Sequence, residues 1–178
     1  MDKIILISGK AEHGKDLSAS ILKEYLEQKG KRVVITRYAL GLKEMAKTYC
    51  GWDGNKDDKG RELLQRLGTD KIRKEMNLPD FHVTRLMEDI LICQDYFDYV
   101  IIPDCRFPNE VEVPKATFGK EKVIDLRVTR LNHISKLNEK QMQHESEIAL
   151  DDYKFSHYVE AENEEQLREK LGDLICGL

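Results

Sequence analysis

The sequence of 178 residues contains no long apolar run. A membrane-spanning helix needs about 20 consecutive apolar residues, and no segment approaches that length, so we expect no membrane partner. The chain passes from Met1-Asp2-Lys3 directly into an apolar stretch, which leaves no room for a signal peptide. These absences predict a cytoplasmic protein with a single domain over residues 1–178.

An excess of basic residues is also absent. Lys and Arg number 29 against 33 Asp and Glu, which gives a formal net charge of -4. Domains that bind nucleic acid through bulk charge are strongly basic, so we expect no nucleic-acid partner. The cysteines lack the Cys-x2-Cys spacing of zinc sites, which predicts free, buried thiols at Cys50, Cys93, Cys105 and Cys176.

What the chain does have is a glycine loop near its start. Gly9 and Gly14-Lys15 follow the spacing Gly-x4-Gly-Lys of a phosphate-binding loop. The apolar run 4–7 before the loop predicts a strand buried on both faces, and apolar residues at helical spacing follow the loop as far as Gly30. A strand, a glycine loop and a helix in this order are the context that the motif requires.

The residue types of this loop suit the phosphates of a nucleotide. Glycines permit turns in which backbone N–H groups converge on phosphate oxygens, helped by the positive end of the following helix. The Lys15 ammonium is placed to reach the terminal phosphates. We therefore predict that the nucleotide is bound by Gly9, Lys10, Ala11, Glu12, His13, Gly14, Lys15 and Asp16.

Asp16 stands where such loops usually have Ser or Thr. A carboxylate is a hard oxygen ligand, which favours a role in holding Mg²⁺ directly or through water. The alternative is that Asp16 only stabilises the N-terminus of the helix that follows.

Strand and helix patterns alternate along the rest of the chain. Further strands are predicted at 32–36, 99–102, 123–128 and 157–160. This alternation predicts an α/β fold of three layers, with a parallel central sheet and helices on both faces. Functional residues in such folds lie beyond the carboxyl ends of the strands, where the loop, Arg37, Asp104 and Arg130 all fall.

A second chemical anchor follows the strand at 99–102, which we expect to end at Pro103-Asp104. An acidic residue in this position is the usual partner of a phosphate loop and orients magnesium or its waters. Arg106 is placed to bind a phosphate group with its planar guanidinium. The alternative is an ordinary surface turn with a local ion pair.

Four segments of the chain share a pattern with a known family. They are Ser8-Gly9-Lys10 through Gly14-Lys15-Asp16, residues 60–70 with Arg73 after them, Asp104-Cys105-Arg106-Phe107-Pro108-Asn109-Glu110, and His144-Glu145-Ser146-Glu147. In these segments the chain resembles deoxynucleoside monophosphate kinases of the bacteriophage type, within the P-loop kinases. It departs at Leu17, where a threonine is common in that family.

The resemblance implies the P-loop NTPase fold of the nucleoside monophosphate kinase type. It also implies ATP- and Mg²⁺-dependent phosphorylation of a deoxynucleoside 5′-monophosphate to the diphosphate, with Mg²⁺ near Asp16 and Asp104. The catalytic residues that it implies are Lys15, Asp104, Arg106 and Arg130. Kinases of this kind can dimerise, so a homodimer is a further expectation.

The resemblance also divides the chain into functional parts. An acceptor-binding helical region is expected at about 38–97, with substrate contacts from Arg37, Lys43, Gln65, Arg66 and Arg73, together with Arg106. A lid-like segment is expected at about 130–147, where Arg130 reaches over the transferred group and polar residues such as Lys136 and Lys140 follow it. A lid excludes water from the reaction; the alternative is a plain surface loop or helical hairpin.

Three other functions stay open. Animal-type phosphomevalonate kinases also carry a Gly-Lys-Asp loop and an Asp-x-Arg turn, and differ in the acceptor pocket. A nucleotide-dependent switch is the second alternative, although Asn55-Lys56-Asp57-Asp58 lacks the spacer of a guanine-reading motif. A noncatalytic nucleotide-binding relative of the family is the third.

Overall fold

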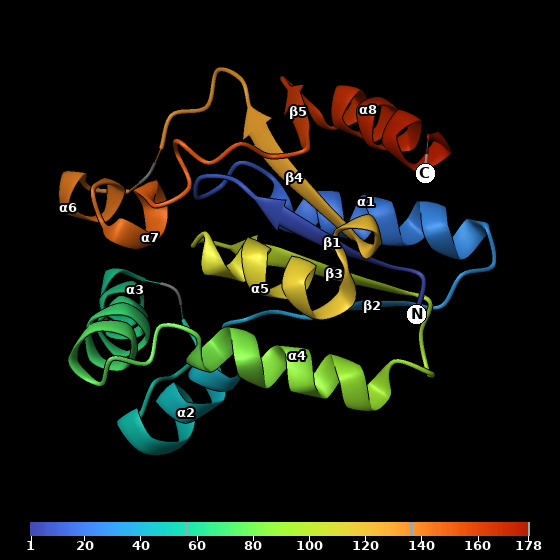
Figure 1. Ribbon diagram of the computed structural model, residues 1–178. Helices are drawn as coiled ribbons and strands as arrows, with labels where there is room; N and C mark the ends of the chain where they lie inside the picture. The colour runs from blue at the N-terminus through green and yellow to red at the C-terminus, as the bar shows by residue number, and fades with distance from the viewer. Residues whose placement is uncertain (56, 136, 178) are drawn as a thin grey trace.

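The computed structural model describes residues 1–55, 57–135 and 137–177. Its five parallel strands form one sheet in the order β2-β3-β1-β4-β5 (Figure 1). The strands are β1 Lys3–Ser8, β2 Val33–Ile35, β3 Tyr99–Cys105, β4 Val123–Arg130 and β5 His157–Ala161. The helices around the sheet are α1 Lys15–Gln28, α2 Leu40–Cys50, α3 Asp58–Gln65, α4 Phe81–Cys93, α5 Asn109–Phe118 and α8 Glu164–Cys176. Four short segments complete the fold: the π-helical η1 Arg66–Glu75, the 3-10 turn η2 Lys120–Lys122, α6 Glu139–Met142 and α7 Glu145–Ile148.

The central position of β1 follows from its sequence. Residues 4–7 are all apolar and at most 1% exposed, because β3 and β4 pair with β1 on its two sides and helices cover both faces. Side chains alternate between the faces of a strand. Accordingly, Ile5 and Ile7 pack with α1 and α8, whereas Ile4 and Leu6 pack with α4 and α5.

The predicted three-layer α/β fold is therefore confirmed. The glycine loop connects the central strand β1 to α1, which is the arrangement of a P-loop NTPase. Since all five strands are parallel, their carboxyl ends share one edge of the sheet. The loop that follows β1 and the ends of β3 and β4 meet at that edge, where open parallel sheets bind their ligands.

The predicted acceptor region and the predicted lid contact each other beside this edge. The acceptor region contains α2, α3, η1 and α4, and α6 and α7 of the lid lie next to α3 (Figure 1). Gln141 of α6 donates a hydrogen bond to Asp58 of α3 at 3.1 Å. Lys74 of η1 pairs with Glu145 of α7 at 3.0 Å. The segment thus contains two short helices in contact with the acceptor region, while Lys136 lies outside the described residues.

Two sequence expectations need correction. Strand β3 continues through Pro103 to Cys105 and does not end at Pro103-Asp104. A proline donates no hydrogen bond to a neighbouring strand, and the pairing of β1 with β3 shifts register between Leu6 and Ser8, opposite this part of β3. The sheet accommodates the proline by this irregularity.

The prediction of buried thiols holds for Cys105 and is wrong for the other cysteines. Cys50, Cys93 and Cys176 are exposed, because each is the last residue of a helix, at α2, α4 and α8 respectively. Within the described residues, no helix has the length and apolar character to cross a membrane.

Candidate functional site

The glycine loop folds tightly against β4. A Cβ atom added at Gly9 would lie 2.5 Å from the carbonyl oxygen of Val128, so only glycine fits this close approach. Gly14 has a φ of 89° and forms the N-cap of α1, where it offers no side chain to the first turn of the helix. No side chain at the N-cap therefore accepts hydrogen bonds from the first backbone N–H groups of α1. Helix ends of this kind bind anions.

Lys15 folds back over this loop. Its Nζ donates hydrogen bonds to the carbonyl oxygens of Gly9 and Lys10, both at 2.7 Å. Burial, followed by the nearby charge of Arg106, lowers the pKa of Lys15 to about 7. At neutral pH, Lys15 is therefore protonated in only part of the molecules. A bound anion favours the protonated form, so this lysine is suited to contact a polyphosphate.

A carboxylate from the lid reaches the same place. Glu147 of α7 accepts a hydrogen bond from the backbone N–H of Ala11 at 3.2 Å. Its other oxygen pairs with Nη1 of Arg106, and Arg106 also donates to the carbonyl oxygen of Ser146 at 3.4 Å. The lid, the phosphate loop and the turn after β3 therefore converge on one carboxylate.

Asp104 connects β3 to the acceptor region. Its two carboxylate oxygens accept hydrogen bonds from the backbone N–H groups of Tyr38 and Ala39, at 3.0 and 3.1 Å. These two groups lie immediately before α2, so Asp104 fixes the backbone that leads into that helix. Burial raises the pKa of Asp104, and the two backbone hydrogen bonds oppose that rise.

A buried ion pair joins η1 to the turn after β3. Nη2 of Arg73 lies 2.6 Å from Oε1 of Glu110, and the Arg73 guanidinium stacks over the ring of Phe107 at 3.9 Å. Oε2 of Glu110 accepts from the backbone N–H groups of Arg106 and Phe107, at 2.6 and 3.1 Å. Burial raises the pKa of Glu110 to about 7, against the opposing charge of Arg73. This pair fixes the turn that carries Arg106.

One cavity of about 400 Å³ lies between these groups. Most of the predicted site residues line it: Ala11, Glu12, Lys15, Asp16, Arg37, Lys43, Gln65, Arg73, Asp104 and Arg106. Arg66 is exposed and does not line it, because its helical position turns it away from the neighbouring Gln65. The structure thus brings the phosphate loop and the predicted acceptor residues together around one space; whether they bind ligands stays a prediction.

Several lining residues received no role from the sequence. Tyr38, Leu42, Leu64 and Phe107 form an apolar wall, and Glu110 and Glu147 add carboxylates. Both carboxylates belong to the segments that carry the family resemblance, which is the signal that could have marked them. Leu64 and Phe107 belong to these segments too, whereas Tyr38 and Leu42 lie outside them and have no feature that distinguishes a cavity wall from a core.

His82 in the same wall has an unusual environment. Its Nε2 atom is buried, and no group among the described residues bonds to it. Burial, followed by the charge of Arg73, lowers the pKa of His82 to about 4. At neutral pH this imidazole is therefore uncharged.

Arg130 belongs to a neighbouring cavity and not to the one just described. This second cavity, of about 240 Å³, lies between the start of α1, the end of β4 and the start of α8. Its apolar lining comes from Leu17, Val128 and Leu167. His13 also lines it, and its Nδ1 accepts a hydrogen bond from the backbone N–H of Arg130 at 3.2 Å. Arg130, the predicted lid arginine, thus lines the second cavity and not the one that contains Arg73 and Arg106.

The predicted metal ligands have protein partners. Asp16 pairs with Nη2 of Arg37 at 2.6 Å, and its side chain is 69% exposed; Asp104 bonds to the start of α2. Among the described residues, no group of three or more His, Cys, Asp or Glu could hold a metal ion by itself. Mg²⁺ in kinases is bound mainly by substrate phosphates and waters with one or two carboxylates, so Asp16 and Asp104 fit that more limited role.

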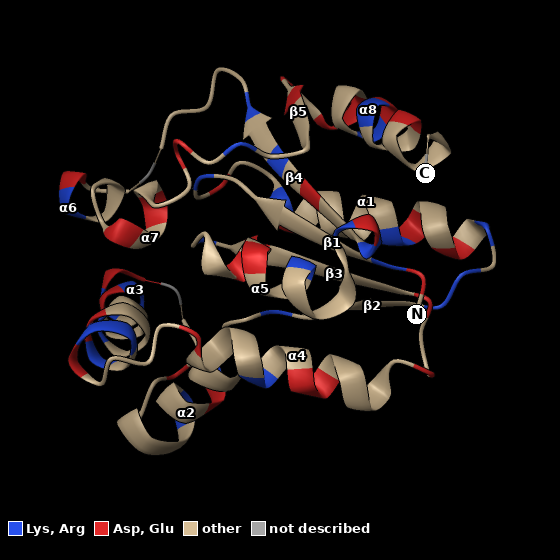
Figure 2. Ribbon diagram, viewed as in Figure 1, with Lys and Arg blue, Asp and Glu red and all other residues tan. Residues whose placement is uncertain are grey.

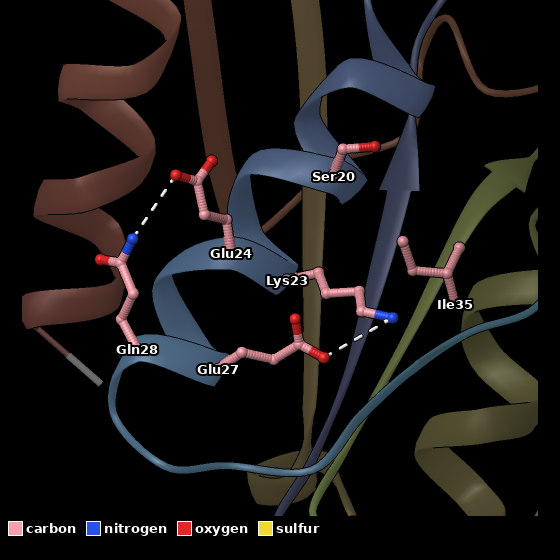
Figure 3. A pocket seen from close by; sticks show the side chains of 6 residues that line it. All are labelled: Ser20, Lys23, Glu24, Glu27, Gln28 and Ile35. Atoms are coloured by element: carbon pink, nitrogen blue, oxygen red, sulfur yellow. Dashed lines mark hydrogen bonds and ion pairs between the residues drawn. The ribbon is translucent and has the colours of Figure 1, made fainter.

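A shallow depression on α1 lies away from these groups. Figure 3 shows its side chains, which come mostly from the exposed face of that helix. They pair with one another: Lys23 with Glu27 at 3.6 Å, and Gln28 with Glu24 at 3.4 Å. Such mutually paired, solvated side chains are typical of a helix surface, and we assign this depression no function.

The chain is similar to one known protein in sequence and to another in structure. No protein-family model matches the chain. The chain is 28% identical over 138 residues to a phosphomevalonate kinase of Drosophila melanogaster, covering 72% of this chain and 68% of that protein. A solved structure of an APS kinase from Mycobacterium tuberculosis is also similar, at 13% identity and a TM-score of 0.48 over 97% of this chain and 96% of the other. The sequence similarity and the β1–loop–α1 geometry support a place in the P-loop kinase superfamily.

Proposed function

We propose that the protein transfers the terminal phosphoryl group of ATP to a phosphate group on a small molecule. The observation that carries this proposal is the single cavity that joins Lys15 and the glycine loop to Arg73 and Arg106. A donor tail at the loop would face an acceptor phosphate held by the arginines, which is the alignment that phosphoryl transfer needs. A phosphate oxygen is already ionised, so the site needs no general base.

The second cavity suits the nucleoside of the donor. It adjoins Gly14 at the start of α1, and its apolar lining is broken by the polar residues at the end of β4. Ligand pockets combine an apolar lining with a few polar groups that orient the ligand. A base held there would place Arg130 and His13 beside the phosphates.

The chain's own residues divide the remaining work. The loop amides and Lys15 hold the donor phosphates, and Arg106 steadies the acceptor phosphate from the other side of the cavity. Asp16 and Asp104 are the carboxylates that would hold Mg²⁺, which would neutralise phosphate charge when bound. Helix α6, whose Gln141 lines the cavity, excludes water from the transferred group.

We propose a deoxynucleoside 5′-monophosphate as the acceptor. The four-segment resemblance to the bacteriophage kinases supports this choice, and so does the wall of the cavity. Tyr38 and Phe107 contribute buried aromatic rings to this wall, against which a planar base could pack at its edges. The amide of Gln65 offers hydrogen bonds to its edge.

Phosphomevalonate is the second candidate acceptor. The observation that favours it is the 28% identity to the Drosophila melanogaster phosphomevalonate kinase. Its carboxylate would need a cation at the far end of the cavity, where Lys43 and Arg61 line the wall. The two candidates therefore share the phosphate-binding end of the cavity and differ at its other end.

A coupled ADP-release assay with MgATP tests these proposals. Each deoxy- and ribonucleoside monophosphate and phosphomevalonate is offered separately, and we expect a deoxynucleoside monophosphate to give the highest kcat/KM. A rate raised only by phosphomevalonate would make the second candidate correct. If no acceptor raises ADP release above background hydrolysis, the kinase proposal is wrong.

Matched variants connect the activity to the cavity. Arg106→Lys keeps the charge but loses the planar guanidinium, so the KM for the acceptor should rise by roughly tenfold or more. Arg66→Lys makes the same exchange at an exposed position outside the cavity and should leave the KM unchanged. Equal effects of the two substitutions would remove Arg106 from the acceptor site.

A further inference from the structure

The Glu147 carboxylate lies among groups that are suited to phosphate. One of its oxygens accepts the backbone N–H of Ala11 in the glycine loop, and the other pairs with the guanidinium of Arg106. Its side chain is only 8% exposed. Backbone amides of such loops and arginine guanidinium groups are the two standard protein partners of phosphate oxygens, and here both contact one carboxylate.

The position of Glu147 between these partners is informative. Ala11 belongs to the half of the site that we assign to the donor, and Arg106 belongs to the half that we assign to the acceptor. A group that contacts both at once occupies the space between the two halves. In a phosphoryl transfer, that space belongs to the group that moves.

Charge balance supports the same conclusion. Lys15 and Arg106 bring two basic side chains to one cavity, where like charges repel each other. The carboxylate of Glu147 lines the same cavity and pairs with Arg106, which offsets this repulsion. Figure 2 shows that α7, which contains Glu145 and Glu147, carries acidic residues. Glu147 therefore provides the negative charge that a phosphate would otherwise bring.

Helix α7 is attached to the loop by further contacts. Nζ of Lys10 donates to the carbonyl oxygen of Glu147 at 2.7 Å and pairs with Asp151 at 2.5 Å. Asp151 also pairs with Arg127 of β4 at 3.1 Å. Because the backbone of Glu147 is held as well as its side chain, displacement of the carboxylate is coupled to movement of α7.

We propose that Glu147 is an internal substitute for phosphate: its carboxylate fills the position of the transferred phosphoryl group, and a polyphosphate must displace it to bind. This inference rests on the proposed function, since it takes the loop and Arg106 as phosphate ligands. A carboxylate and a polyphosphate repel each other at contact distance. Binding of the donor therefore drives Glu147 and α7 away from the loop.

Inorganic tripolyphosphate is the probe that tests this inference, because it carries the phosphate chain without a nucleoside. Its Kd is measured by titration calorimetry for the unaltered protein, for Glu147→Gln and for Glu145→Gln. The first substitution keeps an oxygen for the Ala11 amide but removes the competing charge, so tripolyphosphate should bind roughly tenfold more tightly. Glu145 is exposed on the same helix and pairs with Lys74, away from the loop, so Glu145→Gln should bind as the unaltered protein does.

Hydrogen exchange of the unaltered protein gives a second measurement that needs no variant. Tripolyphosphate should increase amide exchange in residues 145–148 and decrease it in the glycine loop. Stronger protection of 145–148 would overturn the inference, as would equal or weaker tripolyphosphate binding by Glu147→Gln. Binding to the unaltered protein without a gain in Glu147→Gln contradicts this inference alone, whereas no binding to any of the proteins contradicts the proposed function as well.

Discussion

Binding of a polyphosphate should be accompanied by uptake of a proton at Lys15. The pKa of this lysine is about 7, because it is buried and lies near Arg106. Triphosphate oxygens beside Nζ would favour the charged form strongly and return its pKa to the ordinary range of lysine. The number of protons taken up on binding then equals the fraction of Lys15 that is deprotonated in the unliganded protein. This fraction is about 0.9 at pH 8, about 0.5 at pH 7 and about 0.1 at pH 6.

Affinity should depend on pH in the matching direction. Above pH 7 the unliganded protein must gain a proton to bind, so the Kd of MgATP should rise by up to about tenfold per pH unit. Below pH 7 Lys15 is already charged, so its contribution to the pH dependence disappears. The phosphates of ATP are fully ionised at pH 8, which makes that pH the clearest condition for the measurement.

Titration calorimetry in buffers of different ionisation enthalpy measures the uptake directly. The control is Lys15→Arg, which keeps a cation that stays charged throughout this pH range and should bind MgATP with no uptake from this position. A wild-type uptake near zero at pH 8, or an equal uptake in Lys15→Arg, would refute the assignment. The second outcome would point to another group, such as His13, whose pKa is lowered by burial and the nearby His133.

Three further substitutions test separate parts of the structure. Gly9→Ala puts a Cβ 2.5 Å from the Val128 carbonyl oxygen and should lower the unfolding free energy by about 1–3 kcal/mol in urea titrations; a loss under about 0.5 kcal/mol would contradict this contact. Arg73→Met leaves buried Glu110 without its cation and should cost about 3 kcal/mol at pH 8, part of which Glu110→Gln should restore in the double variant; an additive double variant would mean that the pair is not coupled. Arg130→Ala should lower kcat by about 10²-fold without changing the thermal midpoint, and an unchanged rate would remove Arg130 from the mechanism.

Local sequence pattern was sufficient for most of the fold. Strands β1, β3 and β4 are apolar runs, and their period of two or their continuous burial is visible without coordinates. Even the short β5 was predicted, at 157–160 against the observed His157–Ala161. The predicted end of β3 is wrong because a proline normally stops a strand. In this sheet, the irregular pairing of β3 with β1 accommodates Pro103.

The sequence predicts which residues line the site, but it does not predict which residues contact one another. The spacing of the glycine loop and the turn at Asp104 identified both halves of the cavity. The partners of these residues are far away in sequence: 136 positions separate Ala11 from Glu147, and 37 separate Arg73 from Glu110. No local periodicity encodes such pairings, since they depend on how η1 and α7 pack against the ends of the strands.

Three carboxylates show why residue type alone gives an incomplete mechanism. In a nucleotide site, an acidic residue is first interpreted as a metal ligand. Here Asp104 accepts hydrogen bonds from the two backbone amides that precede α2, Asp16 pairs with Arg37, and Glu147 bridges the loop and Arg106. Each carboxylate therefore balances a donor or cation of the protein, and a phosphate or metal that enters the site must compete for those partners. Ligand binding in this cavity is an exchange of ionic partners, and its cost depends on contacts that only the fold creates.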